Sequence, residues 1–142
     1  MTRRRRIALA APLLFIACAR VEPMPDLFPD AVAGVWRRTA IRDLPVSESP
    51  DPVPRTSVNR IQAASYEGPG KIEARVYELT SSAAGLDLAQ RWRPSADTVF
   101  FNQGRYFAVV KWRDADRRAL QAFVRELEGR LPIAGRRSGI EK

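Results

Sequence analysis

The side chains that most often carry out catalysis or bind metals are almost absent from this sequence. Its 142 residues contain no histidine and a single cysteine, Cys18. Histidine is the commonest general base near neutral pH, and zinc sites need several Cys or His ligands. Ser-His-Asp and Cys-His catalytic groups are therefore excluded, as is a disulfide within the chain. The sequence predicts neither a metal site nor a cofactor.

The carboxylates are also not spaced as a catalytic pair or a metal site would require. Glu73 and Glu78 are an odd number of positions apart on an expected strand, so they face opposite sides and are not a glycosidase-type pair. Helix capping and solvated faces explain four other acidic residues better than a cation site does: Asp114, Asp116, Glu126 and Glu128. The run Glu67-Gly68-Pro69-Gly70 precedes a strand rather than a helix, and its proline lacks an N–H donor, so it is not a phosphate loop. We therefore expect a binding protein and not an enzyme.

Several large side chains could contribute to a binding surface. Five aromatic residues could line a ligand groove, although aromatic side chains more often fill cores: Trp36, Trp92, Trp112, Tyr66 and Tyr106. The run Arg91-Trp92-Arg93 could bind an anion or a glycan. A solvated helix end, with arginine at the favourable C-terminal position, is the better interpretation of this run.

The first residues have the composition of an export signal. Arg3 to Arg6 form a charged run, and the apolar run from Ile7 to Ala17 is far shorter than the roughly 20 residues that span a bilayer. We expect residues 1–17 to be a signal peptide. An ordinary charged n-region explains the arginines better than twin-arginine export does, but the sequence does not decide between the two routes.

The run Phe15-Ile16-Ala17-Cys18 resembles the lipobox of bacterial lipoproteins. This resemblance implies cleavage before Cys18 and attachment of a diacylglyceryl group to its thiol, so Cys18 is the expected lipid (palmitate) attachment site. In bacteria with two membranes, an Asp after the cysteine tends to retain lipoproteins on the inner membrane. Because Ala19 stands there, we expect an exported protein anchored to the outer membrane and facing the periplasm.

Charge argues against a nucleic-acid partner. Lys and Arg number 24 against 16 Asp and Glu, a formal net charge of +8. Four of these cations, Arg3 to Arg6, belong to the expected signal peptide, which leaves a net charge of +4 scattered over the rest of the chain. A nucleic-acid binder would carry a denser basic stripe.

The rest of the chain predicts one domain on a tether. Residues 18–29 carry the lipidated Cys and three prolines that favour a flexible tether, residues 30–131 form the domain, and residues 132–142 form a loose tail. Segment 31–41 predicts a first strand, and a long Pro-rich surface loop follows. Turn residues then predict hairpins around Gly68-Pro69-Gly70 and Asn102-Gln103-Gly104.

Two helices complete the expected fold. One covers about Ala83 to Arg91 after a Ser cap, and the other follows a cap at Asp114 or Asp116. The last helix has the clearest apolar periodicity, at Leu120, Phe123, Val124, Leu127 and Leu131. The order strand–hairpin–helix–hairpin–helix predicts an α+β fold: an antiparallel sheet of about five strands with two α-helices packed on one face. Arg105 to Val110 is apolar on both sides, which indicates a strand inside the sheet.

Three strings resemble a family of small uncharacterised exported bacterial proteins, a domain of unknown function. They are Tyr66 to Gly70, Val76 to Leu79, and Phe101 to Trp112 followed by a Leu-rich helix, and the resemblance covers about residues 28–131. It supports the fold and implies no activity. The sequence therefore leaves two functions open. The first is a membrane-anchored, non-catalytic module that binds another envelope protein through the loop Leu44 to Arg55. The alternative is a domain that binds a small ligand or lipid in a cavity between sheet and helices.

Overall fold

The structure is a computed structural model that describes residues 27–132. The expected signal peptide, Cys18, and most of the tether and of the tail lie outside these residues. The elements within the described part are β1 (Ala31–Val32), β2 (Trp36–Leu44), η1 (Val46–Glu48), η2 (Arg55–Ser57), β3 (Val58–Gly68), β4 (Gly70–Leu79), α1 (Ser82–Arg91), β5 (Thr98–Gln103), β6 (Tyr106–Arg113) and α2 (Arg117–Arg130). Neither helix in this part of the chain has the length and apolar character needed to cross a membrane.

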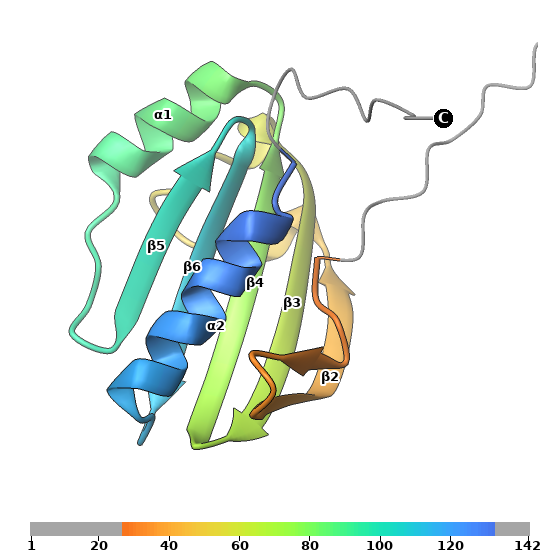
Figure 1. Cartoon of the computed structure of the whole chain (residues 1–142). Coiled ribbons are helices and arrows are strands. Elements are labelled where there is room, and N and C mark those ends of the chain that lie inside the picture. Colours follow the sequence, from red (N-terminus) through yellow and green to blue (C-terminus); the bar gives the residue numbers. More distant parts are fainter. Residues whose placement is uncertain (1–26, 133–142) are drawn as a thin grey trace, which may run out of the picture.

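The strands form one antiparallel sheet in the spatial order β1-β2-β3-β4-β6-β5 (Figure 1). This confirms the α+β class, but the sheet has six strands where the sequence predicted about five. The difference arises because Ala33 and Gly34 adopt positive φ angles of 51° and 71°. The chain turns there, and the short β1 pairs back on the start of β2 instead of continuing into it.

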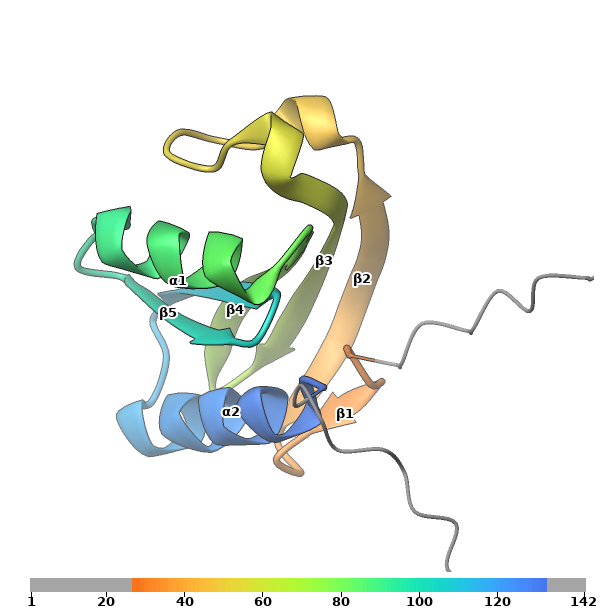
Figure 2. The same ribbon diagram turned by 90° about the horizontal axis from the view of Figure 1, so that it is seen from above.

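The two helices lie on opposite faces of the sheet (Figure 2), so the expectation that both pack on one face was wrong. The central strands explain why. Along β6, Phe107 belongs to the core under α1, whereas Ala108 and Val110 belong to the core under α2. A strand that is apolar on both sides needs cover on both faces of the sheet, and one helix on each side supplies it.

The core on the α2 side also takes in the start of the described chain. Its buried side chains are Leu27, Phe28, Val32, Trp36, Ala64, Tyr66, Ile72, Ala74, Val76, Tyr106, Ala108, Val110, Phe123, Leu127 and Leu131. Leu27 and Phe28, which the sequence analysis assigned to the tether, are completely buried. The domain therefore begins before residue 30.

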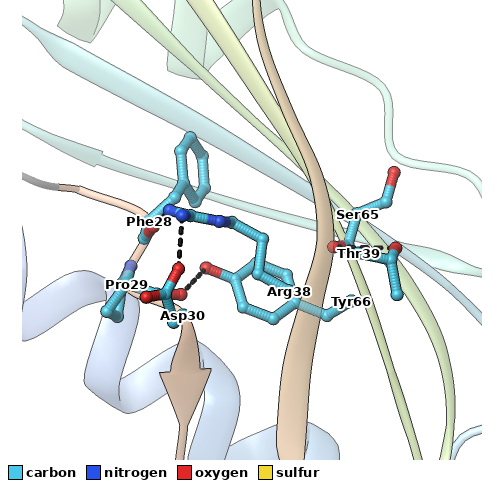
Figure 3. A network of polar contacts seen from close by, with 7 residues as sticks. All are labelled: Phe28, Pro29, Asp30, Arg38, Thr39, Ser65 and Tyr66. Atoms are coloured by element: carbon cyan, nitrogen blue, oxygen red, sulfur yellow. Dashed lines mark hydrogen bonds and ion pairs between the residues drawn. The ribbon is translucent and has the colours of Figure 1, made fainter.

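Polar contacts fasten this N-terminal segment to the sheet (Figure 3). The guanidinium of Arg38 donates hydrogen bonds to the carbonyl oxygen of Phe28 and to the carboxylate of Asp30. The hydroxyl of Tyr66, whose ring is buried, donates to the carbonyl oxygen of Pro29 at 2.8 Å. These bonds satisfy backbone acceptors that the buried segment would otherwise leave unpaired.

The core on the α1 side is closed in part by the Pro-rich segment. Its buried side chains are Val53, Val58, Ile61, Tyr77, Leu79, Leu88 and Phe107. Val53 is 4% exposed, and Val46 in η1 packs against the same core. The segment expected to be a surface loop therefore packs over one end of the sheet, on the same side as α1 (Figure 2).

The helix caps follow the sequence. The Ser81 hydroxyl accepts a hydrogen bond from the backbone N–H of Ala84 at 3.1 Å, which caps α1. Of the two candidates for α2, Asp116 is the cap, and its carboxylate accepts from the N–H of Ala119 at 2.9 Å. Pro94 and Pro132 follow the two helices within two or three residues, where proline discourages a further turn.

Candidate functional site

The candidate site lies on the α1-side face of the sheet, and β4 runs through its centre. Lys71, Glu73, Arg75 and Tyr77 alternate with residues of the α2-side core, so they share this face. Helix α1 crosses only one end of the sheet (Figure 1). Tyr77 is buried, Glu73 and Arg75 are half-buried, and Lys71 is exposed. The face thus changes along β4 from an apolar core to an open polar surface.

Two adjoining hollows occupy this open surface. The larger has a volume of about 540 Å³, and its polar lining is Thr39, Ser65, Glu67, Lys71, Glu73, Asp97, Lys111 and Arg113. The smaller, of about 260 Å³, lies between the Pro-rich segment and the chain after α1 and is lined by residues that include Pro50, Arg75, Tyr77, Trp92 and Arg93. Both hollows are bordered by Glu73 and Lys111. We call their union the polar groove.

Strand register brings the groove residues together from distant parts of the sequence. On β4, Glu73 pairs with Ser65 of β3 on one side and with Lys111 of β6 on the other. Lys71 likewise lies opposite Arg113. At the β2 side, the Thr39 hydroxyl donates to the carbonyl oxygen of Ser65 at 3.3 Å (Figure 3). The floor of the groove is therefore a rigid sheet, which fixes the spacing of its charges.

Arg75 is held in place by its neighbour on the strand. Its Nε and Nη2 atoms donate to the same Glu73 oxygen, Oε1, at 3.0 and 2.8 Å. Burial lowers the pKa of Arg75, but the hydrogen bonds that it donates to Glu73 and its electrostatic interactions with Tyr77 and Glu73 outweigh burial, so the pKa is raised. The guanidinium thus remains charged, and it also interacts with the side chain of Tyr77.

Tyr77 closes the buried end of the groove. Burial of its ring is the largest influence and raises the pKa of the phenol, while the charge of nearby Arg75 acts in the opposite direction. The hydroxyl is therefore neutral at physiological pH. It can donate or accept a hydrogen bond, but it does not act as a base there.

The remaining charges of the groove leave a positive excess. Lys71 pairs with Glu67 at 3.7 Å. Asp97 accepts hydrogen bonds from Ser95 and Thr98, and the Ser95 bond is the largest influence that lowers its pKa, with the charge of Lys111 contributing. Within residues 27–132, Arg93 and Arg113 have no ion pair. The groove contains five cations and three carboxylates: Lys71, Arg75, Arg93, Lys111 and Arg113 against Glu67, Glu73 and Asp97.

Two groups of the groove have fixed protonation states near neutral pH. Tyr77 is held neutral and Asp97 ionised, so neither exchanges a proton near neutral pH. The sequence supplies no histidine to do so instead. What the groove offers is a pattern of charges and hydrogen-bonding groups held by neighbouring strands.

The structure separates the five aromatic residues that could have lined a groove. Trp36, Tyr66 and Tyr106 are buried in the α2-side core, and Trp112 packs against that core. Of the five, only Trp92 packs on the α1 side, against the rings of Phe100 and Phe107. Trp92 lines the smaller hollow, and Tyr66 and Trp112 also contribute to the lining of the larger one. The indole N–H of Trp92 is buried without an acceptor among residues 27–132.

The other residues singled out by sequence have structural roles. Arg91, at the end of α1, pairs with Asp87 one turn earlier, whereas Arg93 borders the groove. Glu78 faces away from Glu73, as the odd spacing predicted, and pairs with Arg105 at 3.2 Å. The Glu126 carboxylate accepts a hydrogen bond from the N–H of Ala33 at 2.6 Å.

Sequence reasoning identified part of the groove and missed the rest. The alternation of Lys71, Glu73 and Arg75 was visible and indicated a polar strand face. Lys111 and Arg113 were not connected with that face, because they are about forty residues away and their register with β4 is a tertiary property. The alternating polar residues after Val110 were the one local signal that the end of this strand has a polar face.

Comparison with known proteins identifies no relative whose site could be compared with this groove. The site must therefore be interpreted from its own residues. No family model, no curated protein and no solved structure matches the chain.

Proposed function

We propose that the protein is a lipoprotein of the bacterial envelope whose domain is a non-catalytic protein-interaction module, and that the polar groove is its contact surface. The observation that carries the proposal is the groove itself. It is open, its floor is a β-sheet, and ion pairs already position two of its cations, Lys71 against Glu67 and Arg75 against Glu73. A surface organised before binding loses less conformational entropy when a partner docks.

The position of the Pro-rich segment supports the groove over the loop Leu44 to Arg55 as the contact surface. Val53 is buried and Ser49 is 8% exposed, so the segment packs against the core and is not a freely exposed loop. Pro50 nevertheless borders the groove. The segment therefore acts as one wall of the contact surface rather than as an independent loop.

The alternative function, a small-ligand or lipid-binding cavity, has less support. Side chains from both helices fill the space against the sheet, and the groove lies beside α1 instead of beneath it. Small-ligand sites are mostly apolar with few polar groups. The larger hollow has the opposite composition, with charged side chains from three strands.

The expected lipid anchor complements such a module. The lipobox-like run ending at Cys18 would hold the domain at a membrane, and the short chain before Leu27 would keep it within a few tens of Å of the surface. Tethering raises the effective concentration of the domain toward a partner in the same envelope. A weak, charge-based contact is then sufficient for function.

The proposal is tested by cross-linking capture from intact envelopes. The full-length chain is compared with a groove variant, Lys111→Glu with Arg113→Glu. A control variant, Arg117→Glu with Arg118→Glu, makes the same charge change on exposed residues of α2. We expect the groove variant to lose the cross-linked partner that the control retains. Equal capture by both variants would remove the groove from the proposal, and turnover of a substrate that depends on a single Ser or Glu would refute the non-catalytic assignment.

A further inference from the structure

The two edge regions of the sheet differ in the features that prevent pairing with another strand. At the β2 edge, β1 pairs with Trp36 and Arg37, the N–H of Arg38 bonds to the carbonyl oxygen of Asp30, and a bulge follows. Exposed charges, including Arg42, continue along it. Cover, bulges and charge are the usual means of preventing edge-to-edge pairing. Strand β5 itself carries no charge, no proline and no bulge: its sequence is uncharged, and its pairing with β6 is unbroken.

Hydrogen-bond alternation shows which backbone groups of β5 face outward. The N–H of Trp112 donates to the carbonyl oxygen of Asp97 at 3.0 Å. In an antiparallel ladder every second residue bonds to the same neighbour, so Val99, Phe101 and Gln103 direct their backbone groups toward β6. Phe100 and Asn102 therefore direct theirs away from the sheet. All six residues of β5 are partly exposed, and β5 is the outermost strand on its side (Figure 1).

We infer that β5 pairs with β5 of a second copy of this chain, antiparallel and about a twofold axis at Phe101. This inference does not rest on the proposed function, although Asp97 and Thr98 also line the groove. In that register the outward backbone groups of Phe100 meet those of Asn102 in the other copy, so two hydrogen-bonded pairs form. The contact is isologous, as twofold dimers require, and it joins two sheets into one.

Charge complementarity favours this register and a second copy of the chain as the partner of β5. Pairing about Phe101 places Asp97, just before the strand, opposite Arg105 of the other copy, in the turn just after it. The symmetry produces this opposite-charge pair twice. Arg105 is half exposed even though it contacts Glu78, and the uncharged residues between the two ends let identical strands meet without like-charge repulsion. A self-pairing strand that carried a charge at its centre would oppose that charge to itself.

A zero-length cross-link tests the register in membranes that contain the full-length chain. Two differently tagged copies, both with Arg105→Lys, are expressed together and treated with a carbodiimide, which joins a carboxylate directly to an amine. We expect a peptide that links Asp97 to Lys at position 105, recovered from species that carry both tags. The two positions lie beyond opposite ends of β5, whose six residues span roughly 20 Å at about 3.3 Å per residue, so this link does not form within one chain. The link from position 105 to Glu78 does form within one chain and shows that the lysine reacts.

Charge exchange separates the proposed pair from incidental contact. Asp97→Arg alone and Arg105→Asp alone should each abolish the dimer, and the double variant should restore it, with thermal melting confirming that each variant is folded. Monomers at every concentration, or loss without restoration, would overturn the inference. A dimer that forms only after residues 133–142 are removed would also overturn it, because the chain's own tail would then be the natural occupant of the β5 edge.

Discussion

At the scale of single residues, β4 has two kinds of side chain on its α1-side face. Arg75 is kept charged by Glu73, and Tyr77 is kept neutral chiefly by burial. The two residues are only two positions apart. Their contrasting states show how abruptly the apolar core gives way to the groove.

Tyr77 provides a titration test of this boundary. Because burial favours the neutral phenol, its folded-state pKa lies above that of an unfolded tyrosine, about 10. The stabilising contribution is therefore complete below about pH 10 and is lost as pH rises above that value. Of the three tyrosines in the chain, Tyr77 should become ionised later than an ordinary one. Tyr77→Phe should remove the late part of the phenolate absorbance curve, and loss of the early part instead would mean that the ring is exposed.

Individual residues also show the limit of sequence reasoning about the site. The odd spacing of Glu73 and Glu78 settled that they face apart, because alternation along a strand is a local rule. Whether Trp36 or Trp92 borders a groove depends on how each residue is placed after folding. Composition indicates only that aromatic side chains seek burial, so the expectation was the same for all five.

At the scale of elements, local pattern was enough to place hairpins and helices but not to arrange them. The first helix begins at Ser82, one residue before the expected start, and both hairpins are present. The face that each helix covers was missed. Periodicity shows which side of a helix is apolar, but it does not show which side of the sheet that helix reaches. The apolar run up to Val110 contained the missing information, since it needs cover on two faces.

Two helical glycines test how closely α1 packs. A methyl group on Gly85 would approach the Asn102 Nδ2 atom at 2.5 Å and the Gly104 carbonyl oxygen at 2.6 Å, whereas one on Gly129 in α2 would meet nothing within 4 Å. Alanine gains up to about 1 kcal/mol over glycine within a helix. We expect Gly129→Ala to raise the free energy of unfolding by up to that amount. Gly85→Ala should lower it by about 1–3 kcal/mol because of overpacking.

Urea unfolding of the two alanine variants makes the comparison. The sign difference is the essential result, since helix propensity alone predicts the same direction for both. If both variants were stabilised, α1 would lie farther from the turn at Gly104 than the structure places it.

At the scale of the whole molecule, the domain presents two adjoining surfaces, the groove on one face and the β5 edge, which share Asp97 and Thr98. A protein held at a membrane can use both at once, because one dimer would offer two grooves to the same envelope. This arrangement depends on the anchor, which rests on the sequence around Cys18.

The anchor is tested by replacing Cys18, which carries the only thiol of the sequence. We expect Cys18→Ser to prevent lipid attachment and to leave the signal uncleaved or cut elsewhere, because the serine hydroxyl does not replace the thiolate as the acceptor. Cells are labelled with a radioactive fatty acid, and the label on the immunoprecipitated protein is compared with that of the wild type. Equal labelling of the two proteins would exclude Cys18 as the lipid attachment site.

The burial of Leu27 and Phe28 has a mechanical consequence. In a chain held at Cys18, tension from the membrane side reaches the domain first at these two side chains and at the contacts that Arg38 and Tyr66 make with the residues just after them. Releasing residues 27–30 would lengthen the tether by roughly 13 Å, at about 3.3 Å per residue. The six-stranded sheet would not have to open. In a chain anchored at Cys18, the segment would therefore be an extensible joint between the membrane and the part of the molecule that carries the groove.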